Sequence, residues 1–255
     1  MSKKMQSLTT RREEPQDTHD RVARPQPAAN ACMRIKLDHL RKFDALTENQ
    51  QKFFTLYKQG SYFTGLFGSA GVGKTFLSMY RAIEEVLDKS NQYKQVVVVR
   101  SAVPGRSQGF LPGTLEEKQE LYELPYKEIC TTLFDRPDAW AQLKEQGHAR
   151  FMSTTAIRGI SIDDSIVIVD ECQNMNWTEL SSVITRVGNR TKIIFCGDWK
   201  QNELTTNRHD QSGLLDFMKV AKSMSEYSEV MFTPQDIVRS NLVKSFILAC
   251  EAHGL

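Results

Sequence analysis

The stretch of sequence that decides the fold is Gly68-Ser69-Ala70-Gly71-Val72-Gly73-Lys74-Thr75, which Phe76 follows. It matches the pattern GxxxxGK(S/T) at every fixed position. The apolar residues 62–67 before it predict a strand, and residues 75–89 after it carry apolar side chains at helical spacing. This order of strand, glycine-rich loop and helix is the setting in which the pattern binds a polyphosphate, and it disfavours the alternative of a turn that binds nothing.

Each residue type in this stretch has a chemical reason. Glycines let successive backbone N–H groups curl around phosphates at places where a Cβ atom would clash. Lys74 is expected to reach the β- and γ-phosphates, and the Thr75 hydroxyl is expected to coordinate Mg²⁺. The amino end of the following helix adds positive potential. The sequence therefore predicts that residues 68–76 bind the phosphates of a nucleotide together with magnesium.

Two carboxylates follow a second apolar run. Residues 166–169 read IVIV, and Asp170 and Glu171 come directly after them. Ligands of a parallel sheet bind at the carboxyl ends of its strands. We expect Asp170 to support the metal and Glu171 to orient or deprotonate the attacking water. A strand end exposed to solvent is the alternative, but pairing with the glycine-rich stretch favours the catalytic interpretation.

Two further side chains are weaker candidates for the same site. Residues 192–196 predict a third buried strand, which leads to Asp198 and Gln201. Gln201 is a candidate for sensing the γ-phosphate by hydrogen bonding. Arg239 precedes the last predicted helix, and its guanidinium is a candidate for stabilising charge on the transferring phosphoryl group. A surface arginine at a helix start is the alternative for Arg239.

The apolar pattern also predicts the fold class. The runs at 96–99, 166–169 and 192–196 do not alternate, which is typical of strands buried on both faces. Helices are expected near 47–60, 75–89, 115–147, 177–187 and 242–252, a loop at 101–114, and a further strand near 229–232. We therefore expect an α/β fold with a mainly parallel central sheet flanked by helices, as in P-loop NTPases. One such domain is expected over residues 37–255.

Length and composition exclude several classes of protein. With 255 residues, 40% of them hydrophobic, and a formal charge of +2, the chain is neither a histone-like basic protein nor wholly disordered. No run approaches the roughly 18 apolar residues of a membrane span, and the first residues do not resemble a secretion signal. The five cysteines are widely spaced, which favours reduced thiols in a cytoplasmic protein and no zinc site.

The charge is concentrated near the amino end. Residues 1–36 hold eight basic and four acidic residues, a net +4, and the rest of the chain sums to −2. Three prolines and the lack of aromatic residues predict a mobile tail here. Such a tail is suited to contact RNA or DNA phosphates. A solubilising leader without a partner is the alternative.

Taken together, the motifs resemble the PhoH-like family of predicted ATPases, which look like the first motor domain of superfamily 1 helicases standing alone. The resemblance covers about residues 45–252, and its most specific part is GFLPGTLEEK at 109–118. Further matches are VDECQN at 169–174, GDWKQ at 197–201 and DIVRS at 236–240. The Trp199-Lys200 pair departs from the small polar residues common in the family. The resemblance implies a RecA-like fold that hydrolyses ATP with Mg²⁺.

The resemblance also implies roles for particular residues and for an assembly. Gln50 would contact adenine, Gln173 would approach the γ-phosphate or the water, and Arg239 would be an arginine finger. Because one motor domain lacks the opposite wall of its nucleotide cleft, we expect a homo-oligomeric ring, a hexamer, in which Arg239 acts across the subunit interface. The chain leaves no room for the nuclease domain that some relatives carry, so nuclease activity is not expected, and one motor domain alone does not predict autonomous unwinding.

Three functional hypotheses follow. The first is hydrolysis of ATP to ADP and phosphate, with Lys74, Glu171, Gln201 and Arg239 as catalytic residues. The second couples that hydrolysis to movement on RNA or single-stranded nucleic acid, favoured by the basic tail and by Arg100 and Arg106. The third is a nucleotide-gated binding or assembly module without motor activity.

Overall fold

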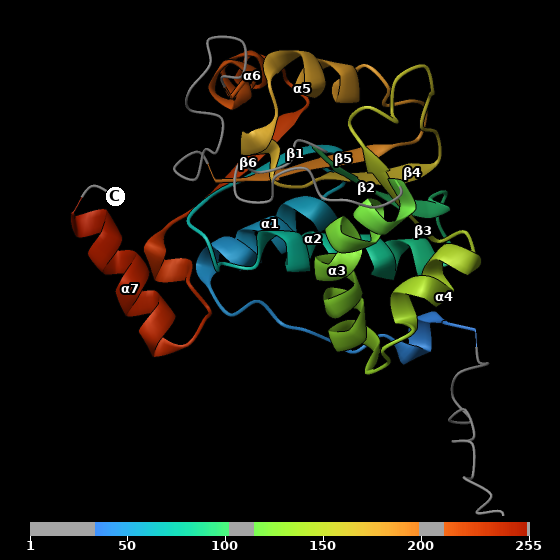
Figure 1. Ribbon diagram of the computed structural model, residues 1–255, viewed down its shortest axis with the longest axis horizontal. Helices are drawn as coiled ribbons and strands as arrows, with labels where there is room; N and C mark the ends of the chain where they lie inside the picture. The colour runs from blue at the N-terminus through green and yellow to red at the C-terminus, as the bar shows by residue number, and fades with distance from the viewer. Residues whose placement is uncertain (1–33, 102–114, 199–211, 254–255) are drawn as a thin grey trace, which may run out of the picture. The chain divides into compact units, whose positions relative to one another are not determined.

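The computed structural model describes residues 34–101, 115–198 and 212–253, and every element below lies within these ranges. The contacts of the chain divide it into two units, and the larger one, Arg34–Leu255, contains all of these elements. Figure 1 shows this unit as a sheet with helices on both sides.

The centre of the fold is a six-stranded sheet in the order β3-β2-β4-β5-β1-β6. Each neighbouring pair of strands runs parallel. The strands are β1 (Phe63–Gly68), β2 (Gln95–Arg100), β3 (Ala149–Ser153), β4 (Ser165–Val169), β5 (Lys192–Gly197) and β6 (Tyr227–Phe232). The predicted α/β class with a parallel central sheet is thus confirmed.

The side chains of a strand alternate between the two faces of the sheet. Apolar residues of the central strands therefore lie on both faces, and a layer of helices covers each face. Val96 and Val98 of β2 join the core beneath one layer, and Val97 and Val99 join the core beneath the other. Figure 1 shows α1 to α4 on one side and α5 with α6 on the other. These helices are α1 (Glu48–Lys58), α2 (Lys74–Leu87), α3 (Leu115–Phe134), α4 (Ala139–Glu145), α5 (Trp177–Ile184) and α6 (Leu214–Lys222).

The remaining elements are short or terminal. Helix α7 (Asn241–Ala252) ends the described chain, and three single turns of 3-10 helix are η1 (Leu37–His39), η2 (Cys172–Asn174) and η3 (Pro234–Asp236). No helix in the described ranges combines the length and the apolar character that crossing a membrane requires.

Two of the longer elements, β3 and α6, were not predicted. Strand β3 lies at one edge of the sheet, and its sequence ARFMS has no β-branched residue and an exposed Arg150 at its second position. Helix α6 is amphipathic, with Leu214 and Phe217 buried, but it has no side-chain cap hydrogen bond at its start. Its N-cap residue is Gly213, and Asp216 in the first turn is a weak sequence signal of a helix start.

The strand order explains how the site forms. Strand β5 lies between β1, which leads into the glycine-rich loop, and β4, which leads into the acidic pair. Since all three strands are parallel, their carboxyl ends meet at one edge of the sheet. The loop after β1, Asp170 after β4 and Asp198 after β5 come together there.

Candidate nucleotide-binding site

The loop between β1 and α2 has a backbone that only glycine adopts easily. Gly71 and Gly73 have φ angles of 75° and 86°, in the left-handed region. A Cβ atom on Gly71 would also lie 2.9 Å from Cγ of Arg239, closer than two carbon atoms pack. Gly73 is the N-cap of α2, so the helix begins with Lys74 at the end of the loop.

Lys74 lies across the loop that it follows. Its Nζ atom donates to the carbonyl oxygens of Gly68, at 2.7 Å, and Ser69, at 2.8 Å. Burial lowers the pKa of Lys74, and the nearby charge of Asp198 opposes that shift. A cation is thus held where a phosphate would lie against the loop.

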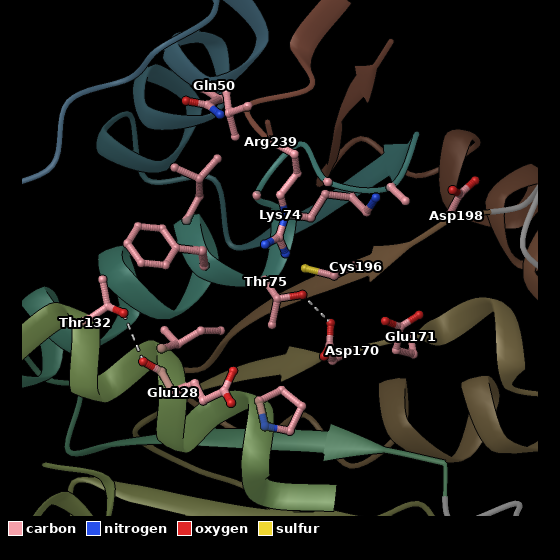
Figure 2. Close-up of a pocket in the computed structure, with 18 of the residues that line it drawn as sticks. Gln50, Lys74, Thr75, Glu128, Thr132, Asp170, Glu171, Cys196, Asp198 and Arg239 are labelled. Atoms are coloured by element: carbon pink, nitrogen blue, oxygen red, sulfur yellow. Dashed lines mark hydrogen bonds between the residues drawn. The ribbon is translucent and has the colours of Figure 1, made fainter. Parts of the chain in front are cut away.

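Thr75 and Asp170 meet although 95 residues separate them. The Thr75 hydroxyl donates to Oδ1 of Asp170 at 2.7 Å, as Figure 2 shows. Asp170 is 4% exposed, and burial together with the charge of Glu171 raises its pKa, against the hydrogen bonds that it accepts. A hydroxyl and a carboxylate are oxygen donors of the kind that Mg²⁺ prefers, so these residues fit the expected metal.

Glu171 is held in an unusual conformation beside Asp170. Its φ angle is 51°, which few residues other than glycine adopt, and such strain is common at functional sites. Its carboxylate accepts a hydrogen bond from Nε2 of Gln173 at 2.5 Å. Oε1 of Gln173 in turn accepts from the backbone N–H of Asp198 at 3.1 Å. The buried Gln173 amide therefore ties Glu171 to the end of β5.

Arg239 reaches the loop of its own chain. The backbone N–H of Val238 donates to the carbonyl oxygen of Gly71 at 3.2 Å, which lays this segment along the loop. In Figure 2 the guanidinium of Arg239 points toward Lys74 and Thr75. The side chain of Arg239 lines the pocket of its own subunit. The expectation that it acts on the nucleotide of a neighbouring subunit stays a prediction.

These groups line one side of a cavity of about 670 Å³. The predicted residues Gln50, Ala70, Gly71, Gly73, Lys74, Thr75 and Phe76 all line it, and Gly68, Ser69 and Val72 are buried behind them. The opposite wall comes from the segment before α1, with Phe43 and Leu46, and from α3, with Ile129. This wall combines apolar side chains with polar ones, because Asp44, Glu128 and Thr132 also line the cavity there.

Gln50 is buried and its amide is bonded within the chain. Its Oε1 accepts from the backbone N–H of Leu46 at 2.8 Å, and its Nε2 donates to the carbonyl of Val72 at 3.0 Å. Gln50 thus fixes the loop to the start of α1. The predicted contact with adenine would therefore involve an amide group that already makes these two hydrogen bonds.

Two residues of the site were missed. The Tyr126 hydroxyl donates to Oδ2 of Asp170 at 2.8 Å, and no motif marks a tyrosine 44 residues away from that carboxylate. Arg100 was assigned to polynucleotide contacts but lines the cavity. Although burial lowers the pKa of Arg100, Tyr126 and the two carboxylates outweigh that effect and raise it.

Gln201 and the family stretch at 109–113 lie outside the described residues, so their positions stay predictions.

The family model for PhoH-like proteins matches residues 42–251. The chain belongs to the PhoH-like family. It is 31% identical over 204 residues to a PhoH-like protein of Bacillus subtilis, covering 80% of this chain and 62% of that protein. It is 32% identical to a PhoH-like protein of Synechocystis, over 72% of this chain and 55% of the relative. The chain therefore spans only about three fifths of such relatives.

A second type of relative matches over a shorter segment. Protein PhoH2 of Bacillus subtilis is 38% identical over 140 residues, which are 53% of this chain and 31% of that protein. Among solved structures, a Pif1 helicase from Bacteroides in complex with ADP-AlF₃ and single-stranded DNA aligns with a TM-score of 0.37 and 16% identity, over 74% of this chain and 43% of the helicase. Family membership and the loop geometry together indicate a nucleotide-binding protein of the P-loop class.

Proposed function

We propose that the protein hydrolyses ATP to ADP and phosphate with Mg²⁺. The observation that carries the proposal is the hydrogen bond between Thr75 and Asp170, because it joins the phosphate loop to the acidic pair. A turn without a role in nucleotide binding would not need a hydrogen bond to a buried carboxylate that follows β4. The choice of ATP among nucleotides rests on the family.

Each residue of the site has its own proposed role in phosphoryl transfer. Lys74 binds the phosphates, and Thr75 and Asp170 hold the metal. Bound Mg²⁺ would supply neutralisation of charge on the phosphate oxygens. Glu171, fixed by Gln173, orients the attacking water and accepts its proton. Gln201 is proposed to sense the γ-phosphate.

We propose that Arg239 stabilises the transferring phosphoryl group within its own subunit. The support is its position beside Gly71 and its place in the cavity wall. Gln50 is proposed to hold the loop in place rather than to select the base, because both ends of its amide are bonded.

A homo-oligomeric ring, expected as a hexamer, remains our proposal for the assembly. Helix α7 supports it, since none of its described side chains is buried and Leu242 and Phe246 are 80% and 68% exposed. Ile247 of α7 packs against the core. A 12-residue helix is marginal without a broader packed apolar face, and a second copy is the occupant we propose for the exposed side chains. The helix begins two residues after Arg239, so contact there would bear on the site.

We also propose that RNA or single-stranded nucleic acid stimulates the hydrolysis. The support comes from the sequence, in the net +4 of residues 1–36. The alternative is a module in which nucleotide binding sets assembly without stimulated turnover.

The proposed function is tested by ATP turnover in the presence of Mg²⁺ or EDTA, with and without a panel of RNA and DNA strands. Wild-type protein should release phosphate only with Mg²⁺, and Lys74→Ala should abolish both turnover and tight binding of a fluorescent ATP analogue. Lys52→Ala, an exposed lysine of α1, is the matched control and should behave like wild type. Binding without turnover under every condition would favour the assembly module, and light scattering with and without ATP would then test nucleotide-dependent assembly.

A further inference from the structure

A second hydroxyl reaches the proposed metal carboxylate. The phenol of Tyr126, on α3, donates to Oδ2 of Asp170 at 2.8 Å, while Thr75 donates to Oδ1. Each oxygen of Asp170 therefore accepts one hydroxyl hydrogen bond. Rotation of the carboxylate would break both bonds at once, so its plane is fixed before any metal arrives.

Tyr126 is itself held rigidly. Its side chain is fully buried, and its ring packs at 6.1 Å from Trp140 and 5.8 Å from Phe151, measured between ring centroids. Few positions are open to a phenol packed in this way. The hydroxyl is thus aimed at Asp170 by the core between α3, α4 and β3.

Core packing alone does not account for the hydroxyl. A phenylalanine would fill the same space, and a buried hydroxyl costs free energy unless it is bonded. Here its partner is the carboxylate that the proposed function assigns to Mg²⁺. In known metal sites, groups that hydrogen bond to a metal ligand set its orientation, and their loss costs about 10- to 100-fold in metal affinity.

We propose that Tyr126 is a positioning residue for the magnesium site, acting through Asp170. This inference rests on the proposed function and deepens it, because it assigns a residue that the motifs leave out. It also connects two parts of the site. Helix α3 supplies Ile129 to the cavity wall as well as this hydroxyl, so the wall and the metal carboxylate are held by one element.

The test is Tyr126→Phe, which removes only the hydroxyl. Tyr57→Phe is the matched control, because Tyr57 is also a buried phenol but lies on α1 against Lys192, with 4.3 Å between Nζ and the ring centroid. Three quantities are measured on each protein. They are the affinity for a fluorescent ADP analogue in EDTA, the Mg²⁺ concentration that half-restores metal-dependent binding of the ATP analogue, and binding of Mn²⁺ followed by electron paramagnetic resonance.

Tyr126→Phe should leave the affinity in EDTA unchanged and raise the half-saturating Mg²⁺ and Mn²⁺ concentrations by about 10-fold. Tyr57→Phe should leave all three quantities unchanged. Equal metal affinity in Tyr126→Phe and wild type would overturn the positioning role and leave the proposed function intact. Failure of wild-type protein to bind any nucleotide with Mg²⁺ would overturn both.

A second measurement, on wild-type protein, tests the inference if the Tyr126→Phe protein does not fold. Wild-type protein labelled with ¹³C at tyrosine Cζ has seven such carbons. The Cζ signal of Tyr126 reports its hydroxyl bond and should move when Mg²⁺ is added to protein already saturated with ATP analogue. If none of the seven signals moves on metal addition, the inference is wrong.

Discussion

At the residue scale, the position of Glu171 leads to the clearest prediction. Its strained backbone and its bond to Gln173 aim the carboxylate beside Asp170. Glu171→Gln keeps the size of the side chain but removes the base. We expect ATP turnover to fall by about 10²- to 10⁴-fold, because general base catalysis is lost, while binding of Mg²⁺ and ATP persists. Single-turnover phosphate release and equilibrium binding measure the two effects.

The matched control for this prediction is Glu226→Gln, an exposed carboxylate next to β6. It should leave both turnover and binding unchanged. A Glu171→Gln protein with full turnover would show that another group activates the water.

Residues of the site differed in how far the sequence could predict them. Asp170 and Glu171 directly follow β4, and Lys74 and Thr75 follow the glycine-rich loop after β1, so a local motif places each of them at the edge of the sheet. Tyr126 joins them only through the way α3 packs on the sheet, and no periodic pattern encodes such a contact. Arg239 lies in a sequence motif, but its position beside the loop depends on how the segment after β6 packs along Gly71.

At the scale of elements, some strands can likewise be predicted from the sequence and others cannot. Strands β2, β4 and β5 are central, so burial on both faces selects unbroken apolar runs that are easy to recognise. Within the part of the chain that the structure describes, strand β3 pairs only with β2, and its exposed Arg150 breaks that pattern. An edge strand needs less apolar surface, and it therefore leaves a weaker signal in the sequence.

The single turn η3 fixes the segment that carries Arg239. The Asp236 carboxylate accepts from the Thr233 backbone N–H at 2.9 Å and from Nδ2 of Asn49, on α1, at 2.7 Å. Burial raises the pKa of Asp236, but these hydrogen bonds outweigh it and hold the pKa below its usual range. The turn is thus anchored to α1 by an ionised carboxylate.

This anchor predicts how stability depends on pH. A depressed pKa in the folded state stabilises the protein above the unfolded pKa of about 3.9, and that stability is lost as the pH falls through the folded pKa. Asp236→Asn should therefore cost about 2 kcal/mol at neutral pH, and the difference should shrink below about pH 4. Denaturant unfolding at pH 7 and at low pH measures it. The exposed Asp38→Asn is the control, and a pH-independent difference would contradict the argument.

At the scale of the whole molecule, the site can be completed within one subunit or between two. The cavity already holds Lys74, Asp170, Glu171 and Arg239 from a single chain, and α3 with the segment before α1 supplies its far wall. Whether Arg239 acts within its own subunit or across a subunit interface stays a prediction. The exposed Leu242 and Phe246 of α7 support the proposed ring.

Mixing two inactive variants decides between an arginine acting within its subunit and one acting across an interface. Arg239→Ala should lose about 10³- to 10⁵-fold in turnover while still binding ATP, and Glu171→Gln should also be inactive. If Arg239 serves a neighbour, co-assembled subunits would regain activity, because a Glu171→Gln subunit would lend its arginine to a subunit with an intact base. The geometry predicts no recovery at any mixing ratio. The control is wild type co-assembled with Glu171→Gln, whose turnover should follow the wild-type fraction. Recovered activity in the mixture, with the mass of a mixed oligomer, would place the functional Arg239 on the neighbouring subunit.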